Sequence, residues 1–134
     1  PFTRETEDYL ISLLRPGHIR GLTLLGGEPM EPDNQRALLP FLRRVKAECP
    51  GKDIWCWSGA TYERLHTDGD HFRCEITDEL LSLLDVLVDG LFVEALKDLS
   101  LRFRGSSNQR LIDLNATRRT GALTFLPDRD RSRM

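Results

Sequence analysis

The sequence predicts an α/β fold in which parallel strands alternate with helices. Three short apolar segments, 19–25, 53–57 and 86–88, have the length and composition of buried strands. Segments with helical spacing of apolar residues separate them, and each strand runs into a glycine-containing turn. Strands that alternate with helices in this way favour a parallel sheet with right-handed crossovers.

A first helix is expected to begin after Thr3, whose hydroxyl can accept a hydrogen bond from the first helical turn. Acidic residues in that turn suit the positive end of the helix dipole. They are Glu5, Glu7 and Asp8. Pro16 and Gly17 are expected to end the helix before the first strand.

A second helix is expected to begin at Asp33 or Asn34 and to end at the Pro50-Gly51 turn. Its apolar side chains recur at helical spacing. They are Leu38, Leu42, Val45 and Cys49. Pro40 is expected near the first turns, where a proline disturbs a helix least.

The second strand is expected to lead into a short helix that begins at Thr61 and ends at Leu65. The polar segment 66–73 has the composition of a loop. Thr77 is expected to cap a helix that precedes the third strand.

After Phe92 the alternation stops, and shorter elements are expected. Short strands are predicted at 92–94 and 100–104, with a polar loop at 105–110. Segments 111–114 and 122–126 are predicted to pair across a turn at 118–121. The prediction is one α/β domain over 1–126, followed by a charged tail, 127–134, without fixed structure.

The composition limits the possible functions. The chain has 134 residues, a formal net charge of −2 and a pI of about 5.9, which do not favour binding to nucleic acid or to an anionic membrane. No apolar run is long enough to span a bilayer. The odd number of cysteines, 3, is not a disulfide framework and favours the reducing cytoplasm.

The three strand ends carry the residues of greatest functional interest. They read Gly26-Gly27-Glu28-Pro29, Trp57-Ser58-Gly59 and Val88-Asp89-Gly90. In a parallel sheet these ends meet at the carboxyl edge, where ligands bind in α/β folds. A glycine pair is also common in plain tight turns, and a single aspartate in turns and caps. Together they favour a site for a polar small molecule, without the spacing of a phosphate loop or a dinucleotide fingerprint.

Two other groups of residues suggest different sites. Cys56, His66, His71 and Cys74 invite a zinc site, but their spacing fits no established finger and Cys56 falls within a strand. The indole rings of Trp55 and Trp57 have the shape to stack on an adenine, although packing in the core is the favoured interpretation.

These motifs resemble, in order, those of the activating proteins of anaerobic ribonucleoside-triphosphate reductase, a family of radical S-adenosylmethionine enzymes. The resemblance extends roughly over residues 1–115. Its matching stretches are 1–3, 24–29, 48–55, 57–59, 85–90 and 104–110. The first glycine-rich element is shared by many radical S-adenosylmethionine enzymes, whereas the last two stretches are more specific to this family.

The resemblance implies a partial (β/α) barrel and a defined reaction. A 4Fe-4S cluster held by a C-x-x-x-C-x-x-C loop binds S-adenosylmethionine, and reduced flavodoxin or ferredoxin supplies an electron. Cleavage of the cofactor then generates a glycyl radical on the partner reductase. The cofactor-binding residues that the resemblance implies are Gly26, Gly27, Glu28, Pro29, Ser58 and Asp89.

Their implied roles differ. The four residues from Gly26 match a loop that hydrogen-bonds the methionyl amino group, mostly through the backbone. Ser58 and Asp89 match positions expected to touch the ribose or the carboxylate. The loop 105–110 is expected to shape the cofactor or reductase face.

The sequence departs from the family at one essential motif. It contains no C-x-x-x-C-x-x-C, so the cluster cysteines and the first barrel strand are expected upstream of Pro1. No catalytic residue and no metal ligand is therefore assigned within the chain, which alone is expected to be inactive. The alternatives are a non-catalytic module that binds S-adenosylmethionine or the reductase, and a truncated gene product.

Overall fold

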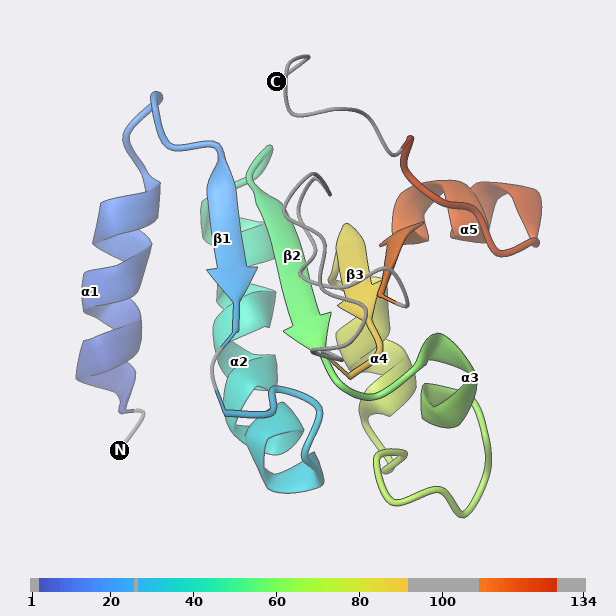
Figure 1. The fold of residues 1–134 in the computed structure, drawn as a ribbon. Coiled ribbons are helices and arrows are strands. Elements are labelled where there is room, and N and C mark those ends of the chain that lie inside the picture. The colour runs from blue at the N-terminus through green and yellow to red at the C-terminus, as the bar shows by residue number, and fades with distance from the viewer. Residues whose placement is uncertain (1–2, 26, 92–108, 128–134) are drawn as a thin grey trace.

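The computed structural model describes residues 3–25, 27–91 and 109–127, which form a mixed α/β fold (Figure 1). Its sheet has four strands in the order β1-β2-β3-β4. They are β1 (Gly21–Leu24), β2 (Asp53–Ser58), β3 (Val86–Asp89) and β4 (Arg110–Asp113). The first three are parallel to one another, as the sequence predicted.

The expected parallel strands are confirmed for β1 to β3, whereas the partial barrel stays a prediction. β4 pairs with β3 in the antiparallel direction, and the described sheet does not close on itself. An antiparallel neighbour needs no helical crossover, and β4 runs back along β3 from the carboxyl edge. The expected strands at 92–94 and 100–104, residue Gly26, the loop residues 105–108 and the tail 128–134 lie outside the described residues.

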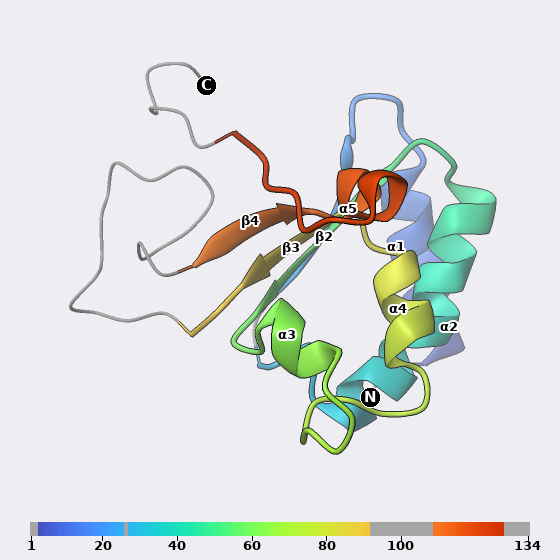
Figure 2. The ribbon, with the colours of Figure 1, turned by 90° about the vertical axis from the view of Figure 1, so that its right-hand side faces the viewer.

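Helices cover one face of the sheet (Figure 2). They are α1 (Arg4–Leu14), α2 (Pro32–Glu48) and α4 (Thr77–Ser82), while the short helices α3 (Tyr62–Leu65) and α5 (Leu114–Thr120) follow β2 and β4. The main core lies between this layer and the sheet. Its side chains include Ile11, Leu42, Ile54, Leu87 and Ile112. No helix in the described part of the chain is long and apolar enough to cross a membrane.

Most helix ends lie close to where capping residues and prolines in the sequence predicted them. The Thr3 side chain accepts a hydrogen bond from the Thr6 N–H at 3.2 Å, and Thr61 caps α3 in the same way. The second helix begins one residue before the predicted range, because Pro32 occupies its first turn. Pro40 lies inside this 17-residue helix rather than in its first turns, on the exposed side.

At two places the structure differs from the predicted type of element. Thr77 is the first residue of α4 and not its cap, and its hydroxyl bonds to Gln35 instead. The expected turn at 118–121 is the end of helix α5, which Asp113 caps and Gly121 terminates at a φ of 73°. The predicted pairing of 111–114 with 122–126 is confirmed at an antiparallel bridge between Ile112 and Phe125.

Candidate functional site

The ends of the three parallel strands lie together, as the sequence predicted (Figure 1). The register places Ser58 at the end of β2 opposite Asp89 at the end of β3, and Asp89 opposite Arg110 at the start of β4. We call the ends of these strands and the described residues that follow them, 25, 27–31, 58–62 and 89–91, the strand-tip edge. It is the edge of a parallel sheet where α/β proteins bind ligands.

The Glu28 carboxylate joins the loop after β1 to the turn after β2. It accepts hydrogen bonds from the Met30 N–H at 2.8 Å, the Ser58 hydroxyl at 2.6 Å and the Gly59 N–H at 2.7 Å. Bonds to an ionised acceptor are stronger than neutral ones. This half-buried carboxylate therefore holds the ends of two strands together.

Ser58 faces the protein rather than solvent. Its side chain is 5% exposed, and its oxygen accepts from the Ala60 N–H at 2.9 Å while the hydroxyl donates to Glu28. Alternate residues of a strand share a face, and Ile54 and Cys56 lie in the core under the helices. Ser58 therefore points to the helix-covered side of the sheet.

Asp89 is fully buried and has several partners. Its carboxylate accepts from the Tyr62 N–H at 2.7 Å and from the Arg110 Nε at 2.9 Å, with a second bond from the Arg110 Nη2. Arg110 also donates to both oxygens of Glu63, at 2.6 and 3.1 Å. These two carboxylates raise the pKa of Arg110, and the hydrogen bond from Arg110 lowers the pKa of Glu63.

Arg110, at the start of β4, lies beside this edge and has a role that the sequence did not indicate. It is 21 positions from Asp89, and the contact depends on β4 running antiparallel to β3. Beside it, the buried Gln109 side chain donates to the Gly90 carbonyl at 3.0 Å. Two elements that carried the family resemblance, 88–90 and the end of 105–110, thus contact each other.

Two positions of the strand-tip edge require glycine for different physical reasons. Gly27 has a φ of 55°, in the left-handed region that glycine adopts without strain. At Gly59 a Cβ atom would lie 2.6 Å from the Leu91 Cδ2 and 3.3 Å from the Glu28 Oε1. Close contact therefore requires glycine at position 59. Pro29 is buried directly after Glu28.

The face of the sheet opposite the helices carries both tryptophans. Trp55 and Trp57 are half-buried and pack against a second, smaller cluster of Val86, Val88 and Leu111. They line a hollow of about 960 Å³, which extends to His18 and Arg20 at the amino ends of the strands. The rings thus contribute to packing, as predicted, but outside the main core.

The cysteines and histidines are spread over separate environments. Cys49 and Cys56 are buried in the main core, and burial raises the pKa of the Cys56 thiol. The Cys74 sulfur lies 3.6 Å from both the Gln35 Oε1 and the Thr77 hydroxyl. His66 contacts the Tyr62 carbonyl.

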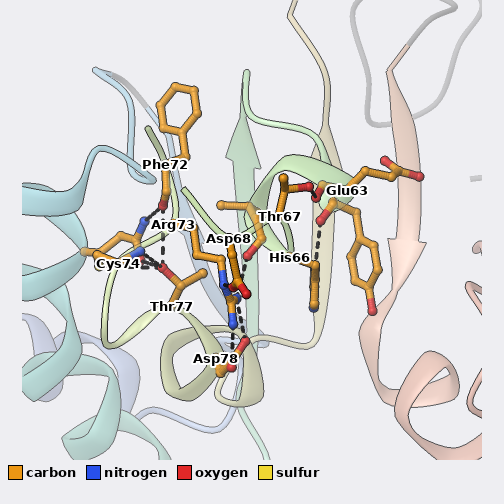
Figure 3. A network of polar contacts seen from close by, with 12 residues as sticks. Glu63, His66, Thr67, Asp68, Phe72, Arg73, Cys74, Thr77 and Asp78 are labelled. Carbon is orange, nitrogen blue, oxygen red and sulfur yellow. Dashed lines mark hydrogen bonds and ion pairs between the residues drawn. The ribbon is translucent and has the colours of Figure 1, made fainter. Parts of the chain in front are cut away.

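Figure 3 shows how the segment after α3 is held. The Phe72 carbonyl accepts a hydrogen bond from the fully buried side-chain amide of Gln35 at 2.7 Å, while Arg73 pairs with Asp68 and Asp78. The same amide donates to the Met30 carbonyl at 2.7 Å, so this segment supports the loop after β1.

No group of three or more histidine, cysteine or acidic side chains in the described ranges is arranged to hold a metal ion. A 4Fe-4S cluster is held by several cysteine thiolates gathered at one site, whereas Cys49 and Cys56 pack in the main core and Cys74 contacts Gln35 and Thr77. The described residues therefore do not fit a 4Fe-4S cluster.

Comparison with known proteins gives consistent matches. Residues 1–112 match the model of the 4Fe-4S single cluster domain. The chain is 44% identical over 111 residues to the anaerobic ribonucleoside-triphosphate reductase-activating protein of Escherichia coli K12, covering 81% of this chain and 67% of that protein. The protein of the same name from Vibrio cholerae is 44% identical over 110 residues, covering 81% of this chain and 66% of that protein.

A more distant relative has the same name. The anaerobic ribonucleoside-triphosphate reductase-activating protein of bacteriophage T4 is 38% identical over 110 residues, covering 82% of this chain and 64% of that protein. The chain thus spans about two thirds of the length of these relatives. No solved structure matches it significantly.

Proposed function

Because the chain belongs to the family of anaerobic ribonucleoside-triphosphate reductase-activating proteins, we propose that it acts in generating the glycyl radical of that reductase. The reaction is the reductive cleavage of S-adenosylmethionine, with reduced flavodoxin or ferredoxin as electron donor. When bound, this cofactor supplies the radical that removes a hydrogen atom from a glycine of the reductase. The observation that carries the proposal is the 44% identity over 81% of the chain.

The strand-tip edge is the proposed cofactor site. Backbone carbonyls of the loop at Gly27 accept hydrogen bonds from the methionyl ammonium, because a cation beside carbonyl dipoles at a strand end is favourable. Gly27 is exposed and left-handed, and a Cβ there would meet no described atom within 4 Å. The loop thus fits a ligand that approaches the main chain closely.

Ser58 and Asp89 remain in the proposed site, but as supports rather than direct contacts. Both side chains are buried and bonded to protein groups. They fix the ends of β2 and β3, so that the backbone around them keeps its position when the ligand binds. This role agrees with their orientation towards the helix-covered side.

The cluster that the family model describes needs ligands from outside these 134 residues. The described cysteines do not fit it, and the sequence contains no C-x-x-x-C-x-x-C motif. We propose that a segment upstream of Pro1 carries these cysteines, and that the reaction takes place in the cytoplasm with the reductase as partner. Residues 1–134 then contribute the strand-tip edge as the cofactor site.

A second candidate function follows from the same departure. The chain without cluster ligands is suited to bind the reductase or S-adenosylmethionine without cleaving the cofactor. Such a module needs the strand-tip edge but no electron donor. It predicts binding of the reductase with no iron and no turnover.

Anaerobic reconstitution tests both functions. The protein with its native upstream sequence is incubated with iron and sulfide, and then with reductant, S-adenosylmethionine and the reductase. Cluster absorbance, 5′-deoxyadenosine in the products and a glycyl radical signal in electron paramagnetic resonance are expected. Absence of all three refutes the activase proposal, and reductase binding without them selects the non-catalytic module.

A further inference from the structure

We infer that Glu28 is a positioning residue, which fixes the strand-tip edge for the ligand without contacting the ligand itself. This inference rests on the proposed function, because the ligand is the cofactor with its methionyl ammonium. The carboxylate of Glu28 joins the loop after β1 to the turn after β2.

The hydrogen-bonding capacity of Glu28 is largely used within the protein. A carboxylate has about four acceptor positions. Three are taken, by the N–H groups of Met30 and Gly59 and the hydroxyl of Ser58, at 2.6 to 2.8 Å. The backbone carbonyl of Glu28 also has partners, since it accepts from the Asn34 side chain at 2.8 Å and the Glu31 N–H at 3.1 Å. The ammonium therefore meets the carbonyl of the exposed Gly27, not Glu28 itself.

The geometry around Gly59 shows that this arrangement is tight. The Gly59 N–H donates to the Glu28 Oε1 at 2.7 Å, and a Cβ on Gly59 would lie 3.3 Å from the same oxygen. The Leu91 side chain closes the other side at 2.6 Å from that Cβ position. The turn after β2 thus has little freedom to move relative to the carboxylate.

The connection continues across the edge. Ser58 links Glu28 to the Ala60 N–H, and Tyr62, two residues later, donates its N–H to Asp89. Asp89 in turn holds Arg110 at the start of β4. A substitution of Glu28 is therefore expected to weaken ligand binding by displacing the backbone, not by removing a contact with the ligand.

The variant Glu28→Gln tests this inference. Its side chain is nearly the same size, but it has one acceptor oxygen for three donors, and its amide NH₂ group faces a donor. The exchange rates of the Gly59 and Met30 amide hydrogens are expected to rise by about tenfold or more, the effect of one charge-assisted hydrogen bond. Glu31→Gln is the matched control, because Glu31 lies in the same loop and pairs with the exposed His71.

Ligand binding separates positioning from a general loss of structure. Binding of S-adenosylhomocysteine and of its analogue without the amino group is measured by calorimetry on folded protein. Glu28→Gln is expected to weaken binding of S-adenosylhomocysteine by about tenfold and to leave binding of the analogue unchanged. The reason is that only the first ligand presents an ammonium to the displaced Gly27 carbonyl. Ser58→Ala, a milder change that removes one donor to Glu28, is expected to act in the same direction.

Three results would overturn or redirect this inference. Unchanged amide exchange at Gly59 in Glu28→Gln means that the carboxylate does not hold the turn. An equal loss of affinity for both ligands means that Glu28 acts on something other than the ammonium site. If the wild-type protein binds neither ligand, the proposed cofactor site is wrong, and the amide exchange alone decides whether Glu28 holds the edge.

Discussion

The buried pair of Asp89 and Arg110 predicts an asymmetric response to mutation. Asp89 is 0% exposed, whereas the side chain of Arg110 is 30% exposed and also pairs with Glu63. Replacing Arg110 by methionine leaves a buried carboxylate with the Tyr62 N–H as its remaining described partner. Replacing Asp89 by asparagine leaves a guanidinium that still reaches Glu63 and water. The first change is therefore expected to destabilise the protein more than the second.

The magnitudes follow from the burial of each group. Removing the partner of a buried charge costs about 3–5 kcal/mol, which is the expected loss for Arg110→Met. Asp89→Asn loses hydrogen bonds to a charged group that stays partly hydrated, at a cost of about 1.5–3 kcal/mol. The double variant removes both charges and is expected to lose less stability than the sum of the two single changes.

Urea denaturation of the four proteins at neutral pH measures these free energies. Arg36→Met is the control, because Arg36 pairs with Glu75 at the surface and both side chains are well exposed. Its loss of stability is expected to be much smaller than that of Arg110→Met. If Asp89→Asn is the more costly change, or if the double variant is fully additive, the argument from burial is wrong.

Three further predictions concern single groups. The bidentate contact with Arg36 lowers the pKa of Glu75 to about 2. The stabilisation that this pair gives the fold is therefore present above the ordinary pKa of 4.5 and is lost as the pH falls towards 2. Nuclear magnetic resonance titration of Glu75 measures this pKa. Gly21→Ala places a Cβ 2.2 Å from the Asp53 carbonyl oxygen and is expected to cost about 1–3 kcal/mol in urea denaturation. The Cys56 thiol, buried and with a raised pKa, is expected to resist alkylation in the folded protein, as followed by mass spectrometry.

Each of these predictions has an internal control. Arg36→Ala should raise the pKa of Glu75 from about 2 towards its ordinary value, and an unchanged value would show that Arg36 is not its cause. Gly17→Ala meets no described atom within 4 Å and should change stability by less than about 0.5 kcal/mol. Cys74, which is half-buried, should be alkylated before Cys56, and the reverse order would contradict the assigned burial.

The elements that the sequence predicted well are those specified by neighbouring residues. The hydroxyls of Thr3 and Thr61 cap helices because the N–H groups they accept from are three residues away. The apolar strands were equally clear, because buried parallel strands are continuous apolar runs. Local composition therefore predicted the three parallel strands and the helices between them.

The elements that were predicted incorrectly depend on distant contacts. The direction of β4 is set by its pairing with β3, more than twenty residues earlier in the chain. Thr77 resembles a cap, but its hydroxyl bonds to the buried Gln35, 42 residues away. Pro40 is accommodated in the middle of α2 because the packing of the helix outweighs the loss of one backbone hydrogen bond.

The sequence partly predicts the orientation of the proposed site residues. Ile54, Cys56 and Ser58 alternate with Trp55 and Trp57, so the serine shares a face with two core residues. That alternation indicates a side chain turned towards the helices. The contact of Asp89 with Arg110 has no such signal, because it requires the register of an antiparallel strand that local sequence does not specify.

The strand-tip edge separates the task of holding the backbone from the task of contacting a ligand. Its acidic side chains, Glu28 and Asp89, each have three of about four acceptor positions used, by backbone N–H groups, a hydroxyl and a guanidinium. Such groups hold a backbone in place but have little left for a ligand. In the proposed site, ligand contacts then fall to main-chain atoms, whose positions depend on both of these side chains. Substitutions at this edge should therefore act jointly, so that Glu28→Gln and Asp89→Asn together weaken ligand binding by more than the product of their separate effects.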